Sequence, residues 1–174
     1  MDVLAHGLWT NLMYKAIPVT RNDRKATWWG ITFGVLPDFA AFTPIFIWYF
    51  YQILTGQMSA PSGRPDFDSM PLADLTHTLY NYTHSFVIFL AVVLLVWAIW
   101  KKFPWFLLGW GLHVVIDIFT HTKEFFVTPF LYPLSDFGVN GIPWSHPVFM
   151  AINYSLLVIL YLLLIPAVRK LIKK

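Results

Sequence analysis

Long apolar stretches alternate with short polar segments along the chain, and their lengths predict helices that cross a membrane. A helix needs about 20 apolar residues to span a ~30 Å hydrocarbon core. The apolar segment 1–17 is too short to cross fully and predicts a short, membrane-inserted N-terminal helix. The pattern therefore predicts an all-α, polytopic transmembrane helical bundle in which residues 1–174 form a single domain. Four charge-poor stretches are long enough, or nearly so, to be its spanning helices: 28–54, 84–100, 103–121 and 148–168.

Proline and polar residues interrupt this pattern. The first predicted span contains Pro37 and Pro44. Because proline removes a backbone hydrogen bond and clashes with the preceding turn, we expect that helix to be kinked or broken. The segment 56–74 is rich in Pro, Gly, Ser and Asp, and it predicts a polar loop.

The composition agrees with a membrane protein. Of the 174 residues, 57% are hydrophobic and only 12% are charged, and the mean hydropathy is +0.60. The formal net charge of +3 is only weakly basic, so it does not suggest nucleic-acid binding. The absence of cysteine excludes disulfides, thiolate metal sites and cysteine nucleophiles.

Basic residues predict the orientation of the bundle. They form three groups, and two predicted spans separate each group from the next, so all three fall on one side of the membrane. The positive-inside rule identifies that side as the cytoplasm. We therefore expect a multi-pass protein of the inner (cytoplasmic) membrane, with its N-terminus outside and its C-terminus in the cytoplasm. The groups are Lys15, Arg21, Arg24 and Lys25; Lys101 and Lys102; and Arg169, Lys170, Lys173 and Lys174.

Three ionisable residues lie inside the third apolar stretch at helical spacing. His113, Asp117 and His121 follow one another at intervals of four residues, so a helix would carry all three on one face. Ionisable groups in the bilayer core cost several kcal/mol unless they are paired or bound to a metal. A stripe of this kind therefore indicates a use for these residues.

Further polar residues fall at similar depths. Counting ~1.5 Å per residue from the nearest basic residue places His6, Asp38 and His84 roughly 14 to 26 Å from the cytoplasmic side. Two interpretations of the convergence stay open: a hydrogen-bond cluster between helices, or a metal site in which imidazoles and carboxylates neutralise a cation. Histidine and aspartate without cysteine suit Zn²⁺, Mn²⁺ or Fe²⁺ better than Ca²⁺. The predicted metal ligands are His6, Asp38, His84, His113, Asp117 and His121.

Two charged residues follow the stripe at the mouth of the predicted site. Glu124 could be a general base or a further ligand, and Lys123 could hold a substrate phosphate; either could equally be an interfacial charge. Asp38 and Asp117 could act as the base if they are not ligands. The predicted catalytic residues are therefore Asp38, Asp117 and Glu124.

Four short motifs, in their order along the chain, resemble the bacterial and archaeal YdjM-like family of membrane-bound, metal-dependent hydrolases, also called the domain of unknown function 457. Members of that family show an early His, a Leu-Pro-Asp element, a Thr-His-Ser element and a His-x-x-x-Asp helix. The arrangement is also similar, more distantly, to the zinc-dependent phospholipase C and P1-type nuclease superfamily. The matching residues are His6, Leu36–Asp38, Thr83–Ser85, and His113 with Asp117.

The chain departs from that family pattern at two places. Ala40 stands where the family often has a second acid, and Leu79–Asn81 stand where it often has His-Arg-Gly. These departures imply a site with fewer ions, or one in which His77 replaces the missing histidine.

The resemblance implies a hydrolase, with zinc as the expected cofactor, or another divalent ion such as manganese or iron. Its substrate would be a phosphoester or ester of a lipid or lipid-linked molecule, cleaved by metal-activated water. The alternative is a non-enzymatic membrane protein, either a metal or proton transporter or a structural partner, because buried His and Asp also form ion pathways. Membrane lipid is the expected partner and nucleic acid is not.

Overall fold

Helices dominate residues 1–59 and 66–164, which are the residues that the computed structural model describes. This part of the chain contains no β-strand, only an isolated bridge between Thr122 and Phe125. The prediction of an all-α fold is therefore confirmed. In chain order the elements are α1 (Val3–Ala16), α2 (Arg24–Leu54), the 3-10 turn η1 (Phe67–Ser69), α3 (Ala73–Thr83), α4 (Phe86–Trp100), the 3-10 turn η2 (Trp105–Leu107), α5 (Leu108–Thr120) and α6 (Pro147–Leu164).

Side-chain caps define where several of these helices begin. The Asp2 carboxylate accepts a hydrogen bond from the backbone N–H of Ala5 at 3.0 Å, and Asp23 does the same for Ala26 at 2.9 Å. The Ser85 hydroxyl accepts from the N–H of Ile88 at 3.2 Å at the start of α4. Each cap satisfies a backbone donor that has no partner within the first turn of a helix.

Two helices are long and apolar enough to cross a membrane: α2, with 31 residues, and α6, with 18. Helices α3 and α4 pass the same test only together, as a pair bent by 56°. The described residues thus contain two candidate spans, or three if the bent pair is one span, which indicates a membrane protein. The 13 residues of α5 reach only about 20 Å, less than the hydrocarbon core. The expectation of four spans stays a prediction.

The large hydrophobic side chains that the fold leaves exposed support this assignment. Only 11% of helix α6 is buried within the described structure. Helix α4 exposes Leu90, Leu94, Leu95 and Trp97 along its length. A helix that is apolar on its outer surface needs a non-aqueous environment to cover it.

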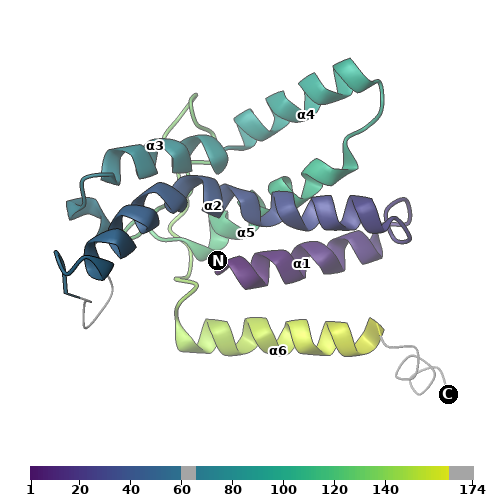
Figure 1. The fold of residues 1–174 in the computed structure, drawn as a ribbon. Coiled ribbons are helices and arrows are strands. Elements are labelled where there is room, and N and C mark those ends of the chain that lie inside the picture. The colour runs from purple at the N-terminus through teal and green to yellow at the C-terminus, as the bar shows by residue number, and fades with distance from the viewer. Residues whose placement is uncertain (60–65, 165–174) are drawn as a thin grey trace.

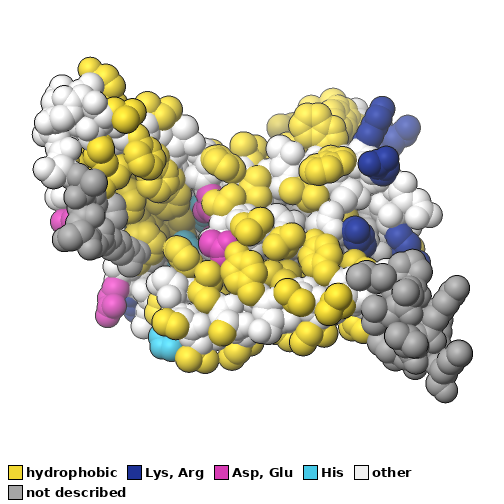
Figure 2. Space-filling model, turned by 60° about the horizontal axis from the view of Figure 1, so that its bottom comes forward, with side chains coloured by type: hydrophobic (Ala, Val, Ile, Leu, Met, Phe, Trp, Pro, Cys, Tyr) yellow, Lys and Arg dark blue, Asp and Glu magenta, His cyan; other side chains and the backbone are white. Residues whose placement is uncertain are grey.

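Most basic side chains gather at one end of the molecule, whereas acidic and histidine atoms lie toward the middle and the other end (Figure 2). The α1–α2 loop and the connection from α4 to α5 are at this same end in Figure 1. The first two basic groups therefore lie together, as the sequence predicts; the side of the membrane that they face stays a prediction. Residues 165–168 of the last predicted span and the third basic group (Arg169, Lys170, Lys173 and Lys174) lie outside the described residues.

Helix α2 is the centre of the fold, because it packs against α1, α3 and α5 (Figure 1). Glycines allow these helices to approach closely. A Cβ atom on Gly109 of α5 would lie 2.0 Å from the carbonyl oxygen of Gly30 in α2. A Cβ atom on Gly34 of α2 would lie 2.4 Å from the Thr10 hydroxyl of α1. Small residues at helix contacts are a common means of packing helices in membranes.

Two elements bear on the sequence-based expectations. Helix α2 continues through Pro37 and Pro44, so of the two predicted outcomes, a kink or a break, the helix is not broken. Helix α3 was not among the predicted helices, because it is rich in polar residues. It forms because Ala73, Thr76 and Tyr80, spaced by three or four residues, bury one face, and because α3 packs against α2.

Candidate metal centre

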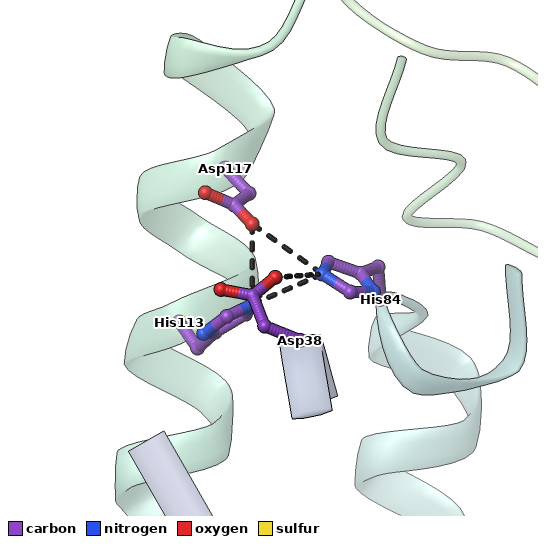
Figure 3. Close-up of side chains that lie close together, drawn as sticks. All are labelled: Asp38, His84, His113 and Asp117. Atoms are coloured by element: carbon purple, nitrogen blue, oxygen red, sulfur yellow. Dashed lines mark hydrogen bonds and ion pairs between the residues drawn. The ribbon is translucent and has the colours of Figure 1, made fainter. Parts of the chain in front are cut away.

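Four ionisable side chains from three parts of the fold meet in the interior (Figure 3). Asp38 comes from α2, His84 from the bend between α3 and α4, and His113 and Asp117 from successive turns of α5. The side chains of His84, His113 and Asp117 are 0% exposed, and that of Asp38 is 11% exposed. The group is therefore closed on most sides and open only at Asp38.

Five of the distances within this group are close to those around a tetrahedral metal ion. Four donor atoms lie within 4.8 Å of one another: Nε2 of each histidine and one oxygen of each carboxylate. The two Nε2 atoms are 3.0 Å apart. Asp117 Oδ2 lies 3.1 Å from His113 Nε2 and 3.4 Å from His84 Nε2. Asp38 Oδ1 lies 3.5 Å from His84 Nε2 and 3.7 Å from His113 Nε2. Ligands at about 2.0–2.1 Å from a tetrahedral Zn²⁺ are separated from each other by about 3.3–3.4 Å.

Backbone carbonyls fix which nitrogen of each imidazole carries the proton. His113 Nδ1 lies 2.8 Å from the carbonyl oxygen of Gly34, and His84 Nδ1 lies 3.1 Å from that of Tyr80. A carbonyl oxygen only accepts hydrogen bonds, so each Nδ1 is the donor and each neutral ring has a lone pair at Nε2. Two lone pairs 3.0 Å apart repel each other unless a cation or a proton lies between them.

A carboxylate oxygen in the same place also needs a partner. Asp117 Oδ2 is buried and makes no hydrogen bond, although both Nε2 atoms are near it. A missing hydrogen bond is expected here, because a nitrogen that carries a lone pair rather than a proton cannot donate to the carboxylate. Leaving a buried carboxylate oxygen unsatisfied is costly, and a divalent cation would satisfy it together with both Nε2 atoms. Asp38, His84, His113 and Asp117 could therefore hold a metal ion, as predicted.

The other two predicted ligands lie at the opposite oxygen of Asp117. His6 Nε2 is 3.0 Å from Asp117 Oδ1, and the His6 ring stacks on that of His113 with centroids 3.8 Å apart. His121 Nε2 is 3.6 Å from the same oxygen, which also accepts a hydrogen bond from the amino nitrogen of Met1. His6 and His121 thus lie beside the group of four rather than within it.

The predicted stripe begins within α5 and ends at the residue that caps the helix. His113 and Asp117 share a face of the helix, but His121 caps its end with φ −109° and ψ 155°, so it leaves the helical path. His121 is still directed toward the centre, because its Nδ1 is held at 2.8 Å from both the Phe126 carbonyl and the Tyr80 hydroxyl.

Tyr80 is a residue of the site that the sequence did not reveal. Its side chain is fully buried, and its ring stacks on His84 with centroids 3.7 Å apart. Its hydroxyl is within 3.0 Å of His121 Nδ1, the Phe126 carbonyl and Thr128 Oγ1. Tyr80 is uncharged and lies in a stretch without apolar periodicity, so the sequence gives little indication that it belongs to the site. Its position one helical turn before His84 is the one feature that points to it.

The remaining polar candidates lie further out. Glu124 does not join the group of four, but it lines two cavities of about 530 and 90 Å³. His121 lines the smaller cavity, and Tyr80, Lys123 and His77 line the larger. His77 Nε2 donates a hydrogen bond to the Asp68 carboxylate at 2.8 Å and its side chain is 44% exposed, so it does not replace a missing ligand of the buried group.

Comparison of the chain with protein families, with curated proteins and with solved structures finds no match. What can be said of function therefore depends on the geometry of the centre.

Proposed function

We propose that the protein is a membrane-embedded, metal-dependent hydrolase that acts on a phosphoester or ester of a lipid or lipid-linked substrate. The observation that carries the proposal is the group of four donors, with two Nε2 lone pairs and one unsatisfied carboxylate oxygen close together in the interior. Zinc is the preferred ion, and manganese or iron are alternatives with the same ligand chemistry.

The residues of the chain have distinct roles in this proposal. Asp38, His84, His113 and Asp117 would hold the ion. His6 would fix the orientation of Asp117 by its bond to Oδ1, and His121 lies close enough to assist. A bound divalent ion supplies a water molecule of lowered pKa and polarises the oxygen of a phosphoryl or acyl group. Glu124, between the two cavities, is placed to accept a proton from substrate or water near the mouth.

Exposure of the centre favours a substrate that approaches within the membrane. Of the four side chains that would hold the ion, only that of Asp38 is partly exposed. Its neighbour on α2, Phe39, is 54% exposed, so an exposed apolar side chain lies next to Asp38 along the helix. An amphiphile, with its reactive bond next to its apolar chains, fits this setting better than a soluble ester.

A transporter is the second candidate, because buried His and Asp also serve as ion relays. The closed packing around His84, His113 and Asp117 is less suited to that role, since a transported ion needs polar access from both faces. Metal-stimulated flux in proteoliposomes that is lost in Asp117→Asn would favour transport over hydrolysis.

The test of the proposal is zinc-dependent turnover of a phospholipid panel by the purified protein, compared with His113→Ala. We expect turnover by the wild type, loss on chelation, recovery on zinc addition, and no turnover by the variant. Equal rates of turnover for the two proteins would refute the proposed hydrolase activity. With the proposed orientation, an impermeant chelator should inhibit from outside right-side-out vesicles and have no effect when trapped inside.

A further inference from the structure

The larger cavity has a lining that selects for a particular kind of ligand. Its volume of about 530 Å³ is within the range of small-molecule sites, about 300–1,000 Å³. Four acidic residues line it, Asp66, Asp68, Glu124 and Asp136, against a single lysine, Lys123. With His77 neutral, the formal charge of the lining is four negative and one positive, or −3. Such a lining repels anions and attracts cations.

The carboxylates of the cavity are too dispersed for a metal ion. Among the described residues, only the buried group of Asp38, His84, His113 and Asp117 brings three or more donor atoms close enough together to share one ion. The cavity therefore suits a larger cation whose charge is spread over several atoms. A quaternary ammonium group has this character, and a primary ammonium group can instead donate hydrogen bonds to more than one carboxylate.

Aromatic side chains complete the lining. Phe67, Tyr80, Phe125 and Phe126 border the cavity together with the acids. Phe126 packs on Tyr80 with centroids 5.2 Å apart and on Phe42 of α2 at 4.9 Å. Aromatic faces attract organic cations, and aromatic walls beside carboxylates are a known means of recognising ammonium groups.

The cavity is adjacent to the metal centre. Tyr80 lines it, and the Tyr80 ring also stacks on that of His84, with centroids 3.7 Å apart. Phe42, one helical turn beyond Asp38 on α2, packs against Tyr80 and Phe126 of the lining. Tyr80 and Phe42 therefore connect the lining of the cavity to the residues of the centre.

We propose that this cavity is a head-group site that binds the cationic amine of a lipid, an ammonium or quaternary ammonium group, and so selects amine-bearing lipids over anionic ones. The assignment rests on the proposed hydrolase function, whose substrate class it narrows. Acidic side chains and aromatic faces bind the amine, and Lys123 is available to the adjoining phosphate.

The experiment measures binding and turnover separately. Binding of short-chain phospholipids with matched acyl chains and choline, ethanolamine or glycerol head groups is measured by calorimetry on the zinc-loaded protein in detergent. Free phosphocholine is included to distinguish a soluble amine from a lipid. The test variant is Asp66→Asn with Asp136→Asn, which removes two charges from the lining and preserves the His77–Asp68 bond. The control is Asp74→Asn, an exposed acid of α3 that does not line the cavity.

We expect the choline and ethanolamine lipids to bind about tenfold more tightly than the glycerol lipid, as cation–π and charge attraction of modest size would give. The double variant should lose most of this preference, and Asp74→Asn should keep it. Equal or tighter binding of the glycerol lipid, or an unchanged preference in the double variant, would overturn the proposal. Free phosphocholine binding as tightly as the choline lipid would overturn the assignment to a lipid.

Turnover distinguishes this proposal from the hydrolase itself. Zinc-dependent turnover of all head groups at equal rates, with equal binding, would refute the head-group site and leave the hydrolase standing. A binding preference that depends on Asp66 and Asp136, without turnover of any lipid, would confirm the site and refute the hydrolase.

Discussion

Adding a single methyl group at Gly109 should disrupt the metal centre from a distance. Gly109 is not a ligand, but it is where α5 contacts the backbone of α2. The Cβ atom of Gly109→Ala would lie 2.0 Å from the Gly30 carbonyl oxygen, about 1.4 Å inside the 3.4 Å at which ordinary contact begins. The atom that it meets is backbone, so the two helices must separate.

The size of that separation decides the effect on the centre. Asp38 is on α2, whereas His113 and Asp117 are on α5, so the shift falls between residues that would hold the same ion. Metal sites tolerate deviations of only about 0.2 Å in ligand distance. A shift of about 1 Å should therefore separate Asp38 from the other three. Overpacking of this kind also costs about 1–3 kcal/mol of stability.

The assay combines zinc affinity, by competition with a chromophoric chelator, with thermal unfolding in detergent. Gly7→Ala is the matched control, because its Cβ would meet Val35 and Ile31 side chains at 3.5 and 3.7 Å, which is ordinary contact. We expect Gly109→Ala to weaken zinc binding and lower the Tm, and Gly7→Ala to bind zinc normally with equal or higher stability. Unchanged zinc affinity and Tm in Gly109→Ala would refute the close contact between α2 and α5.

Two further predictions concern topology and Tyr80. Because the chain has no cysteine, a thiol reagent can modify the single variants Ser69→Cys and Lys102→Cys only at the introduced cysteine. An impermeant maleimide should reach residue 69 from outside cells and residue 102 only after permeabilisation, and the reverse would refute the orientation. Tyr80→Phe should cost about 1–3 kcal/mol in unfolding free energy, because three buried partners lose its hydroxyl. Zinc occupancy should persist, since the ring still stacks on His84; loss of zinc without loss of stability would contradict this.

The sequence predicted the ligands of the centre better than the path of the chain around them. The pairing of His113 with Asp117 follows from helical spacing alone, and the depth count predicted Asp38 and His84 at similar depths. These four residues do lie close together, as expected where a helix rises by a fixed distance per residue.

Other features depend on contacts between distant segments. The end of α5 at His121 is set by Phe126 and by the segment at Gly141, whose N–H bonds to the His121 carbonyl at 2.8 Å. Helix α3 depends on burial of Tyr80 against its neighbours, which apolar periodicity does not reveal. The close approach of α2 and α5 had a signal in Gly30, Gly34 and Gly109, but small residues indicate a contact only once the partner helix is known.

Metal content is the most direct test of the central claim. Protein purified gently in detergent, reloaded with zinc and freed of excess ion is analysed for metal by mass spectrometry, beside His113→Ala and the control His146→Ala, which changes an exposed histidine outside the centre. We expect about one equivalent of zinc or more in the wild type and in His146→Ala. His113→Ala should lose zinc while remaining folded and inserted. Less than about a tenth of an equivalent in the wild type would contradict a metal centre, and Asp38, His84, His113 and Asp117 would then be a proton-sharing hydrogen-bond cluster.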